Sequence, residues 1–268
     1  MEQPASSSSR QDDRFQLLGD LGPERLLSLR GSDSVDLLQR ISASNFHDRA
    51  EGEVFWTLFT NAKGRIVDLA LASECTKEVL LLAGEGHGEL LRGWIESFII
   101  TEDVKLAVGR DALPPLDTQE GDPARKLLET AHHARQEERH ELQAIQRGRF
   151  RPGLDLDERF NPLEVGLEQL VAWDKGCYIG QEVVARLKNY DKVRRTPAVL
   201  AAATSARCEG ELKDDQRVRG QLVRTALQIE PPRRIALAVV EKSLQQGAVL
   251  LDEDGAEWQL ISRPEGAL

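Results

Sequence analysis

The stretch KGCYIGQE, residues 175–182, is the most informative part of this 268-residue chain. It places Cys177 beside a cation and between two glycines, directly before a pattern of apolar residues that predicts an amphipathic helix. A neighbouring positive charge and a helix N-terminus both favour a thiolate, so Lys175 and the following helix predict a reactive thiol at Cys177. The alternative, a small buried cysteine at a strand-to-helix turn, is equally compatible with an isolated cysteine.

Composition limits the class of protein. A chain of 29.9 kDa has room for about two domains. The net charge of −10 argues against nucleic-acid binding over the whole surface, because phosphate contacts need clustered cations. No apolar run approaches the roughly 20 residues that cross a bilayer, so we expect a cytoplasmic protein without membrane contact. Three cysteines, at 75, 177 and 208, are too few and too widely spaced for a disulfide framework or a CxxC metal site, and no metal site is predicted.

Hydrophobic periodicity predicts an α+β fold. Strands are expected at 54–60 and 66–72 on either side of a turn at 61–64, followed by strands at 79–83 and 104–108. Helices are expected from Ser32 or Asp33, over the apolar positions between 90 and 99, and from Pro123 to about Ile145. The glycines at 84, 86 and 88 indicate a plain connection between strand and helix, since their spacing does not match a dinucleotide loop.

The pattern of short strands after residue 196 predicts a small antiparallel barrel, with strands at 198–203, 218–227, 235–240, 248–251 and 257–261. We therefore expect four segments: a disordered tail at 1–13, a first α+β domain at 14–110, a second α+β segment at 111–195 that carries the octet, and the barrel at 196–268. The predicted long polar helix carries His132, His133 and His140, which we interpret as surface histidines because no complete ligand set accompanies them.

The octet resembles the signature of the YgfZ-type folate-binding proteins, which assist iron–sulfur enzymes and tRNA modification and are relatives of the glycine-cleavage T-protein. Other segments resemble the same family in order and spacing, namely residues 31–44, 60–69, 148–158 and 161–167. The linker after the octet differs, because it is basic but lacks the family's glycines. The resemblance implies a T-protein-like body of antiparallel sheets and helices that closes around a folate-sized cavity.

The resemblance also implies a site for tetrahydrofolate or another reduced folate. Glu164 corresponds to the glutamate that holds the pterin edge, and Asp68 to the aspartate that acts on the reactive nitrogens of the folate. Within the sequence alone, Glu164 could equally be a helix N-terminal carboxylate satisfied by backbone amides, and Asp68 could lie on an exposed strand face. Trp173 is a candidate wall for the pterin, and Lys175 and Arg186 are candidate cations for an anionic ligand.

Three functions follow as hypotheses. The first is a folate-binding accessory protein for iron–sulfur cluster assembly or repair and for tRNA modification, in which Cys177 performs thiol or transient cluster chemistry. Its partners would be a reduced folate and iron–sulfur enzymes or assembly proteins, with tRNA contacted indirectly and the chain itself a monomer. The second is a folate-dependent aminomethyltransferase-like one-carbon transferase, for which Asp68 and Glu164 suffice as the catalytic and binding carboxylates. The third is a module that docks on a protein or on tRNA through the basic region from Arg186 to Arg195.

Overall fold

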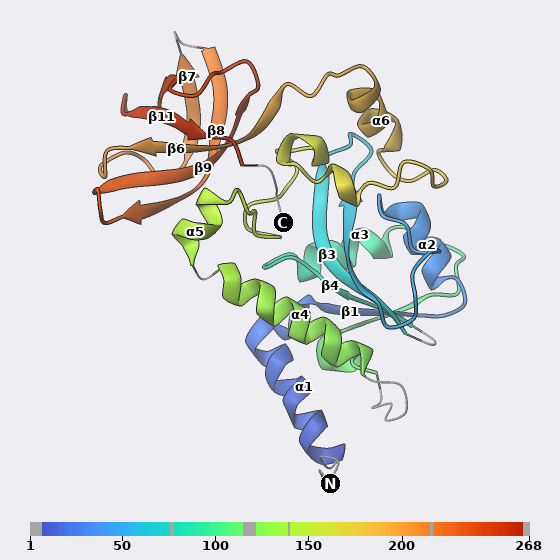
Figure 1. Cartoon of the computed structure of the whole chain (residues 1–268). Coiled ribbons are helices and arrows are strands. Elements are labelled where there is room, and N and C mark those ends of the chain that lie inside the picture. Colours follow the sequence, from blue (N-terminus) through green and yellow to red (C-terminus); the bar gives the residue numbers. More distant parts are fainter. Residues whose placement is uncertain (1–6, 76–77, 115–121, 139, 215–216, 265–268) are drawn as a thin grey trace.

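The computed structural model describes residues 7–75, 78–114, 122–138, 140–214 and 217–264. It combines a body of sheet and helices with a separate closed barrel (Figure 1). In the described residues, no helix is long and apolar enough to cross a membrane.

The body is built on an antiparallel sheet whose five described strands run in the order β2-β3-β4-β1-β5. The strands are β1 (Leu26–Arg30), β2 (Val54–Thr60), β3 (Ile66–Cys75), β4 (Glu78–Leu82) and β5 (Lys105–Val108). β2 and β3 form the predicted hairpin, and their turn contains Gly64 at φ 65°. Four of the five strands match predicted segments, whereas β1 was not predicted.

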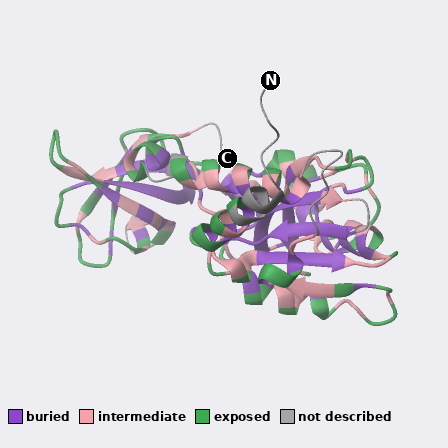
Figure 2. Ribbon diagram, turned by 90° about the horizontal axis from the view of Figure 1, so that it is seen from below, coloured by how far each residue is buried: buried purple, intermediate pink, exposed green. Residues whose placement is uncertain are grey.

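Helices cover both faces of this sheet, and the alternation of side chains along β4 shows how. Val79 and Leu81 pack with α2 (Ser34–Ile41) and α3 (Gly88–Glu96), whereas Leu80 and Leu82 pack with α1 (Ser7–Leu21) and α4 (Pro123–Glu138). The strands therefore form the buried centre of the body, as Figure 2 shows.

One prediction of disorder and one helix prediction were wrong. Residues 7–13, expected in a disordered tail, belong to α1, while residues 1–6 lie outside the described part. The predicted helix over 123–145 is two helices, α4 and α5 (Glu141–Gln146), so His140 precedes α5 instead of sharing a helix with His132 and His133. No proline or glycine marks this break in the sequence.

The C-terminal strands close into a barrel in the order β10-β11-β6-β9-β8-β7, which confirms the predicted architecture. They are β6 (Arg195–Ala202), β7 (Gly210–Asp214), β8 (Arg217–Gln228), β9 (Arg233–Glu241), β10 (Val249–Leu251) and β11 (Glu257–Ser262). β7 was missed because Leu212 is its only buried residue, so it lacks a hydrophobic signal.

The barrel and the body share one hydrophobic core. That core joins Leu58 and Ile66 of the sheet, Phe160 of the connecting segment and Leu237 of the barrel. Beside it, the carboxylate of Asp155 pairs with the guanidinium of Arg224 on β8 at 2.9 Å. The connecting segment from 148 to 180 is thus the element that positions candidate site residues between body and barrel.

Candidate functional site

The two glycines of the octet have different local roles. Gly180 has φ 85° and precedes α6 (Gln181–Asn189), and a Cβ there would lie 2.4 Å from the carbonyl oxygen of Asn61. The hydroxyl of Thr60 donates to the carbonyl of Ile179 at 2.6 Å. Through these contacts the octet packs against the β2–β3 turn. Gly176 meets no atom within 4 Å, so packing does not require glycine there.

Cys177 is exposed in the loop before α6, as a reactive thiol requires. The ammonium group of Lys175 is directed elsewhere: it donates to the carbonyl oxygens of Ser42 and Ser44, both at 2.8 Å. Burial lowers the pKa of Lys175 to about 8. Lys175 therefore links the octet to the segment after α2. Its ammonium group binds two carbonyl oxygens, so the structure does not support the expected interaction of this charge with the thiol of Cys177.

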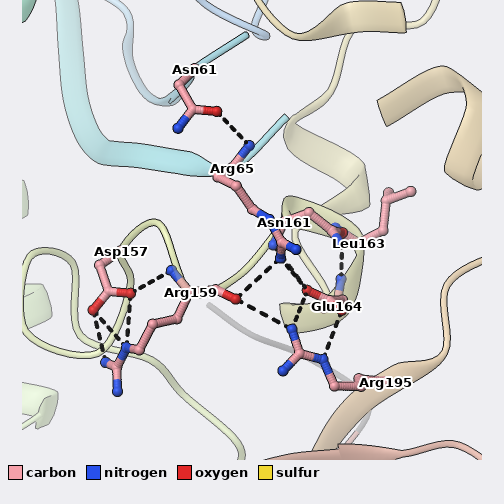
Figure 3. Close-up of polar contacts among 8 residues, drawn as sticks. All are labelled: Asn61, Arg65, Asp157, Arg159, Asn161, Leu163, Glu164 and Arg195. Carbon is pink, nitrogen blue, oxygen red and sulfur yellow. Dashed lines mark hydrogen bonds and ion pairs between the residues drawn. The ribbon is translucent and has the colours of Figure 1, made fainter. Parts of the chain in front are cut away.

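Glu164 is 7% exposed and forms the centre of an ion-pair cluster (Figure 3). Arg195 contacts both carboxylate oxygens, through Nε at 2.8 Å and a terminal nitrogen at 2.9 Å, and Arg65 donates to Oε2 at 3.2 Å. Glu164 also completes a capping box with Asn161 at the start of the short helix η3 (Pro162–Val165). The sequence alternative of a capping carboxylate is therefore correct, and the two arginines are additional partners.

This carboxylate lines a cleft of about 300 Å³ between η3, the linker after α6 and barrel strands β7 to β9. Its walls combine the side chains of Leu187 and Val218 with the cations Lys192, Arg194 and Arg195, and they also include the carboxylates of Glu211 and Glu241. Lys192 and Arg194 are exposed, and the ammonium of Lys192 lies 5.5 Å from the ring centroid of Tyr190. A polar cleft with a carboxylate acceptor, two exposed cations and two apolar side chains suits an elongated ligand with an anionic end.

Asp68 lies on β3 and is fully buried, not on an exposed strand face. Its Oδ2 accepts from the backbone N–H of Gly84 at 3.0 Å, and its Oδ1 pairs with Nδ1 of His87 at 3.0 Å. The hydrogen bond with Asp68 raises the pKa of His87 above its usual value. His87 was not predicted, because it lies 19 positions after Asp68 and the local sequence does not indicate that the two side chains meet.

The remaining predicted residues lie outside the cleft lining. Trp173 is 38% exposed, and the ammonium of Lys188 lies 3.9 Å from its ring centroid. Arg186 is exposed on α6 and has no side-chain partner among the described residues. The cleft at Glu164 is lined by neither of these residues, nor by Asp68, Lys175 or Cys177.

The structure therefore does not gather the predicted residues in one pocket. A second pocket lies between the sheet and α4, where Leu69 and Trp56 face Ala131, and it measures about 30 Å³. This volume holds little more than one water molecule. The expectation of a central folate-sized cavity is not met at this position, because the helices α1 and α4 pack directly on the sheet.

Comparison with known proteins supports the fold. No family model matches the chain. A stretch of 51 residues, 19% of this chain, is 45% identical to the Arabidopsis thaliana protein described as "Putative transferase At1g60990, chloroplastic", and it spans 12% of that protein's length.

Among solved structures, the crystal structure of glycine cleavage system aminomethyltransferase T from Bartonella henselae matches with a TM-score of 0.66 and 15% sequence identity. The match covers 94% of this chain and 90% of that one. This chain therefore has a fold like that of the glycine-cleavage aminomethyltransferase T.

Proposed function

We propose that this protein binds a reduced folate in the cleft beside Glu164 and acts as an accessory protein in iron–sulfur cluster assembly or repair. The observation that carries the proposal is the position of the Glu164 carboxylate on the wall of a polar cleft, in a chain with a T-protein-like fold. The resemblance of the octet to the YgfZ-type proteins supports the accessory role over a purely catalytic one.

The contacts of the Glu164 carboxylate leave one acceptor position for a ligand. Oε2 accepts from Asn161, Arg65 and Arg195, whereas Oε1 accepts from one donor among the described residues, the Nε of Arg195. A carboxylate oxygen has two lone-pair sites, so Oε1 can accept one further N–H bond, such as one from a pterin edge. Arg194 and Lys192 would then attract the anionic tail of the folate.

Cys177 supplies the second part of the proposed function. Its thiol is exposed, so a partner's cluster or thiol can reach it. Such chemistry would be transient, because the described residues contain no group of three histidine, cysteine or acidic side chains placed to hold a metal ion. A contribution to tRNA modification would be indirect, through the iron–sulfur enzymes that this protein serves.

A second candidate, an aminomethyltransferase-like one-carbon transferase, is favoured by the buried Asp68–His87 pair. The two functions differ in their need for the thiol. Cys177→Ala should leave folate affinity almost unchanged and abolish support of an iron–sulfur enzyme, whereas a transferase would keep its activity. Full support of the iron–sulfur enzyme by this variant would refute the thiol role.

Calorimetric titration with tetrahydrofolate tests the binding site. Glu164→Gln keeps an acceptor for the capping box but removes the charge, and we expect folate affinity to fall more than about tenfold, or about 1.4 kcal/mol. Glu168→Gln is the matched control, because Glu168 is exposed, pairs with Lys188 at 2.8 Å and lies outside the cleft lining. Equal affinity for the wild type and Glu164→Gln would remove Glu164 from the site.

A further inference from the structure

A separate pocket of about 520 Å³ lies where β1 leads into α2 and the β3–β4 hairpin ends. It shares no lining residue with the cleft at Glu164, and neither Asp68 nor Cys177 lines it. Its lining includes Ser32, Ser34, Val35, Glu74, Glu78 and Val79. Pockets of this size are typical of sites for small organic molecules, and the proposed folate function leaves this one without a role.

Four of the lining residues belong to one side of the sheet. Glu74 on β3 is the register partner of Val79 on β4, so their side chains point to the same face. Val79 belongs to the core against which Val35 of α2 packs, and Ser34 directly precedes Val35. A carboxylate, a hydroxyl and two apolar side chains therefore line the pocket between the hairpin and α2.

The hydroxyl of Ser34 is the first indication of a ligand. Ser34 is 2% exposed and lines the pocket, and its Oγ has no hydrogen-bond partner among the described residues. A buried hydroxyl without a partner costs free energy, so native structures usually supply one. A hydroxyl can accept as well as donate, and an N–H group of a ligand in this pocket would complete its hydrogen bonding.

The carboxylates of the lining indicate the charge of that ligand. Arg30 donates to Oε2 of Glu78 at 2.8 Å, whereas the carboxylate of Glu74 has no hydrogen bond or salt bridge with a described residue. Burial and the charge of Glu51 raise the pKa of Glu74, while His47 lowers it. A half-buried carboxylate in this position is stabilised by a cation that enters the pocket.

The start of α2 does not reverse this preference. The N-terminus of a helix carries a partial positive charge and by itself favours an anion. Here Asp33 is the N-cap residue and Asp36 lies in the first turn. Asp103 also accepts from the backbone N–H of Ser32 at 3.2 Å and from its hydroxyl at 3.1 Å. Three carboxylates therefore offset the helix dipole beside the pocket.

The chemistry of the pocket favours an organic cation over a metal ion. Burial and neighbouring carboxylates raise the pKa of Cys75, another lining residue, to about 12, so its thiol stays protonated and is a poor metal ligand. Within the part of the chain that the structure describes, no group of three histidine, cysteine or acidic side chains could hold a metal ion. The valines of the lining instead suit an aliphatic chain.

We propose that this pocket binds a small organic cation, a primary ammonium group on a short aliphatic chain. The ammonium group donates to the carboxylate of Glu74 and to the oxygen of the Ser34 hydroxyl. The aliphatic chain lies against Val35 and Val79. This site goes beyond the proposed folate function and does not depend on it, because the two sets of lining residues are separate.

The test is a ¹H–¹⁵N NMR titration of the full chain with n-pentylammonium. We expect saturable shifts of the backbone amide resonances of Ser34, Val35 and Val79. Pentan-1-ol, which has the same chain without a charge, and pentanoate, which has the opposite charge, should bind more than about tenfold more weakly. Absence of saturable shifts at these amides would overturn the site, and equal affinity for pentan-1-ol would overturn the assignment of a cation.

Variants locate the contacts of the ammonium group. Glu74→Gln should lower the affinity for n-pentylammonium more than about tenfold, and Ser34→Ala about threefold or more. Glu257→Gln is the matched control, because it removes an exposed carboxylate from β11 of the barrel, outside the pocket lining, and should leave the affinity unchanged. Wild-type affinity in Glu74→Gln, or an equal loss in Glu257→Gln, would show general attraction to an acidic protein and overturn the inference. The comparison of the three probes uses the wild type and so does not depend on whether a variant folds.

Discussion

Removal of the Asp155 carboxylate tests how the connecting segment holds the barrel. Asp155 is 1% exposed and Arg224 5% exposed, and their charged atoms lie 2.9 Å apart. Asp155 also accepts from the backbone N–H of Arg151 at 2.7 Å. Asp155→Ala therefore leaves a buried guanidinium without this carboxylate and a backbone N–H without this acceptor.

The expected loss is large because the pair is desolvated. Breaking a buried pair by removing one partner destabilises by about 3–5 kcal/mol. For a protein of this size, that corresponds to a fall in Tm of roughly 6–20 °C. Chemical unfolding in urea, followed by circular dichroism, measures the free energy of unfolding directly.

Two further variants sharpen the test. Glu129→Gln, which removes an exposed pair with Arg125 one helical turn away, should cost no more than about 0.5 kcal/mol. The double variant Asp155→Leu/Arg224→Met replaces both charges with apolar groups and should recover most of the loss, since no charge is left buried. A loss below about 1 kcal/mol in Asp155→Ala would refute the reasoning.

Three other predictions concern the octet and the cysteines. Gly180→Ala should destabilise by at least about 2 kcal/mol, because the left-handed backbone and the close carbonyl both oppose a Cβ, whereas Gly176→Ala should be nearly neutral in the same urea assay. Cys177 should react with iodoacetamide faster than Cys75, because Cys177 is exposed and burial raises the pKa of Cys75 to about 12; equal rates, measured by mass spectrometry of the peptides, would contradict this. Tyr178→Phe should stabilise by about 1 kcal/mol, because the buried hydroxyl has no partner among the described residues. Burial raises the pKa of Tyr178 to about 12, so its contribution to stability is present below about pH 10 and lost toward pH 12, and the phenylalanine variant should lack this alkaline loss.

Much of the fold could be predicted because its signals are local. The strand Val54–Thr60 was predicted at its observed bounds, and the turn that follows carries Gly64 at a positive φ. The barrel was predicted from short apolar runs separated by turn residues, while β7 was missed because a strand with one buried side chain resembles a loop. The three-part division at residues 110 and 195 remains a prediction.

The candidate site was less predictable because it depends on tertiary contacts. The capping role of Glu164 is encoded three residues earlier, at Asn161, and could be predicted. Its arginine partners lie 99 and 31 residues away along the chain, and nothing in the local sequence indicates that they meet. Asp68 illustrates a second limit. The alternation of residues along a strand predicts on which face of the sheet Asp68 lies, but it does not predict whether other parts of the chain bury that face.

The most direct test of the account is a crystal structure of the protein with a bound reduced folate, such as 5-formyltetrahydrofolate. We expect the pterin in the cleft between η3 and the barrel, with an N–H group donating to Oε1 of Glu164 and the anionic tail near Arg194. A folate bound elsewhere, with the Glu164–Arg195 pair unchanged and the cleft unoccupied, would contradict the central claim.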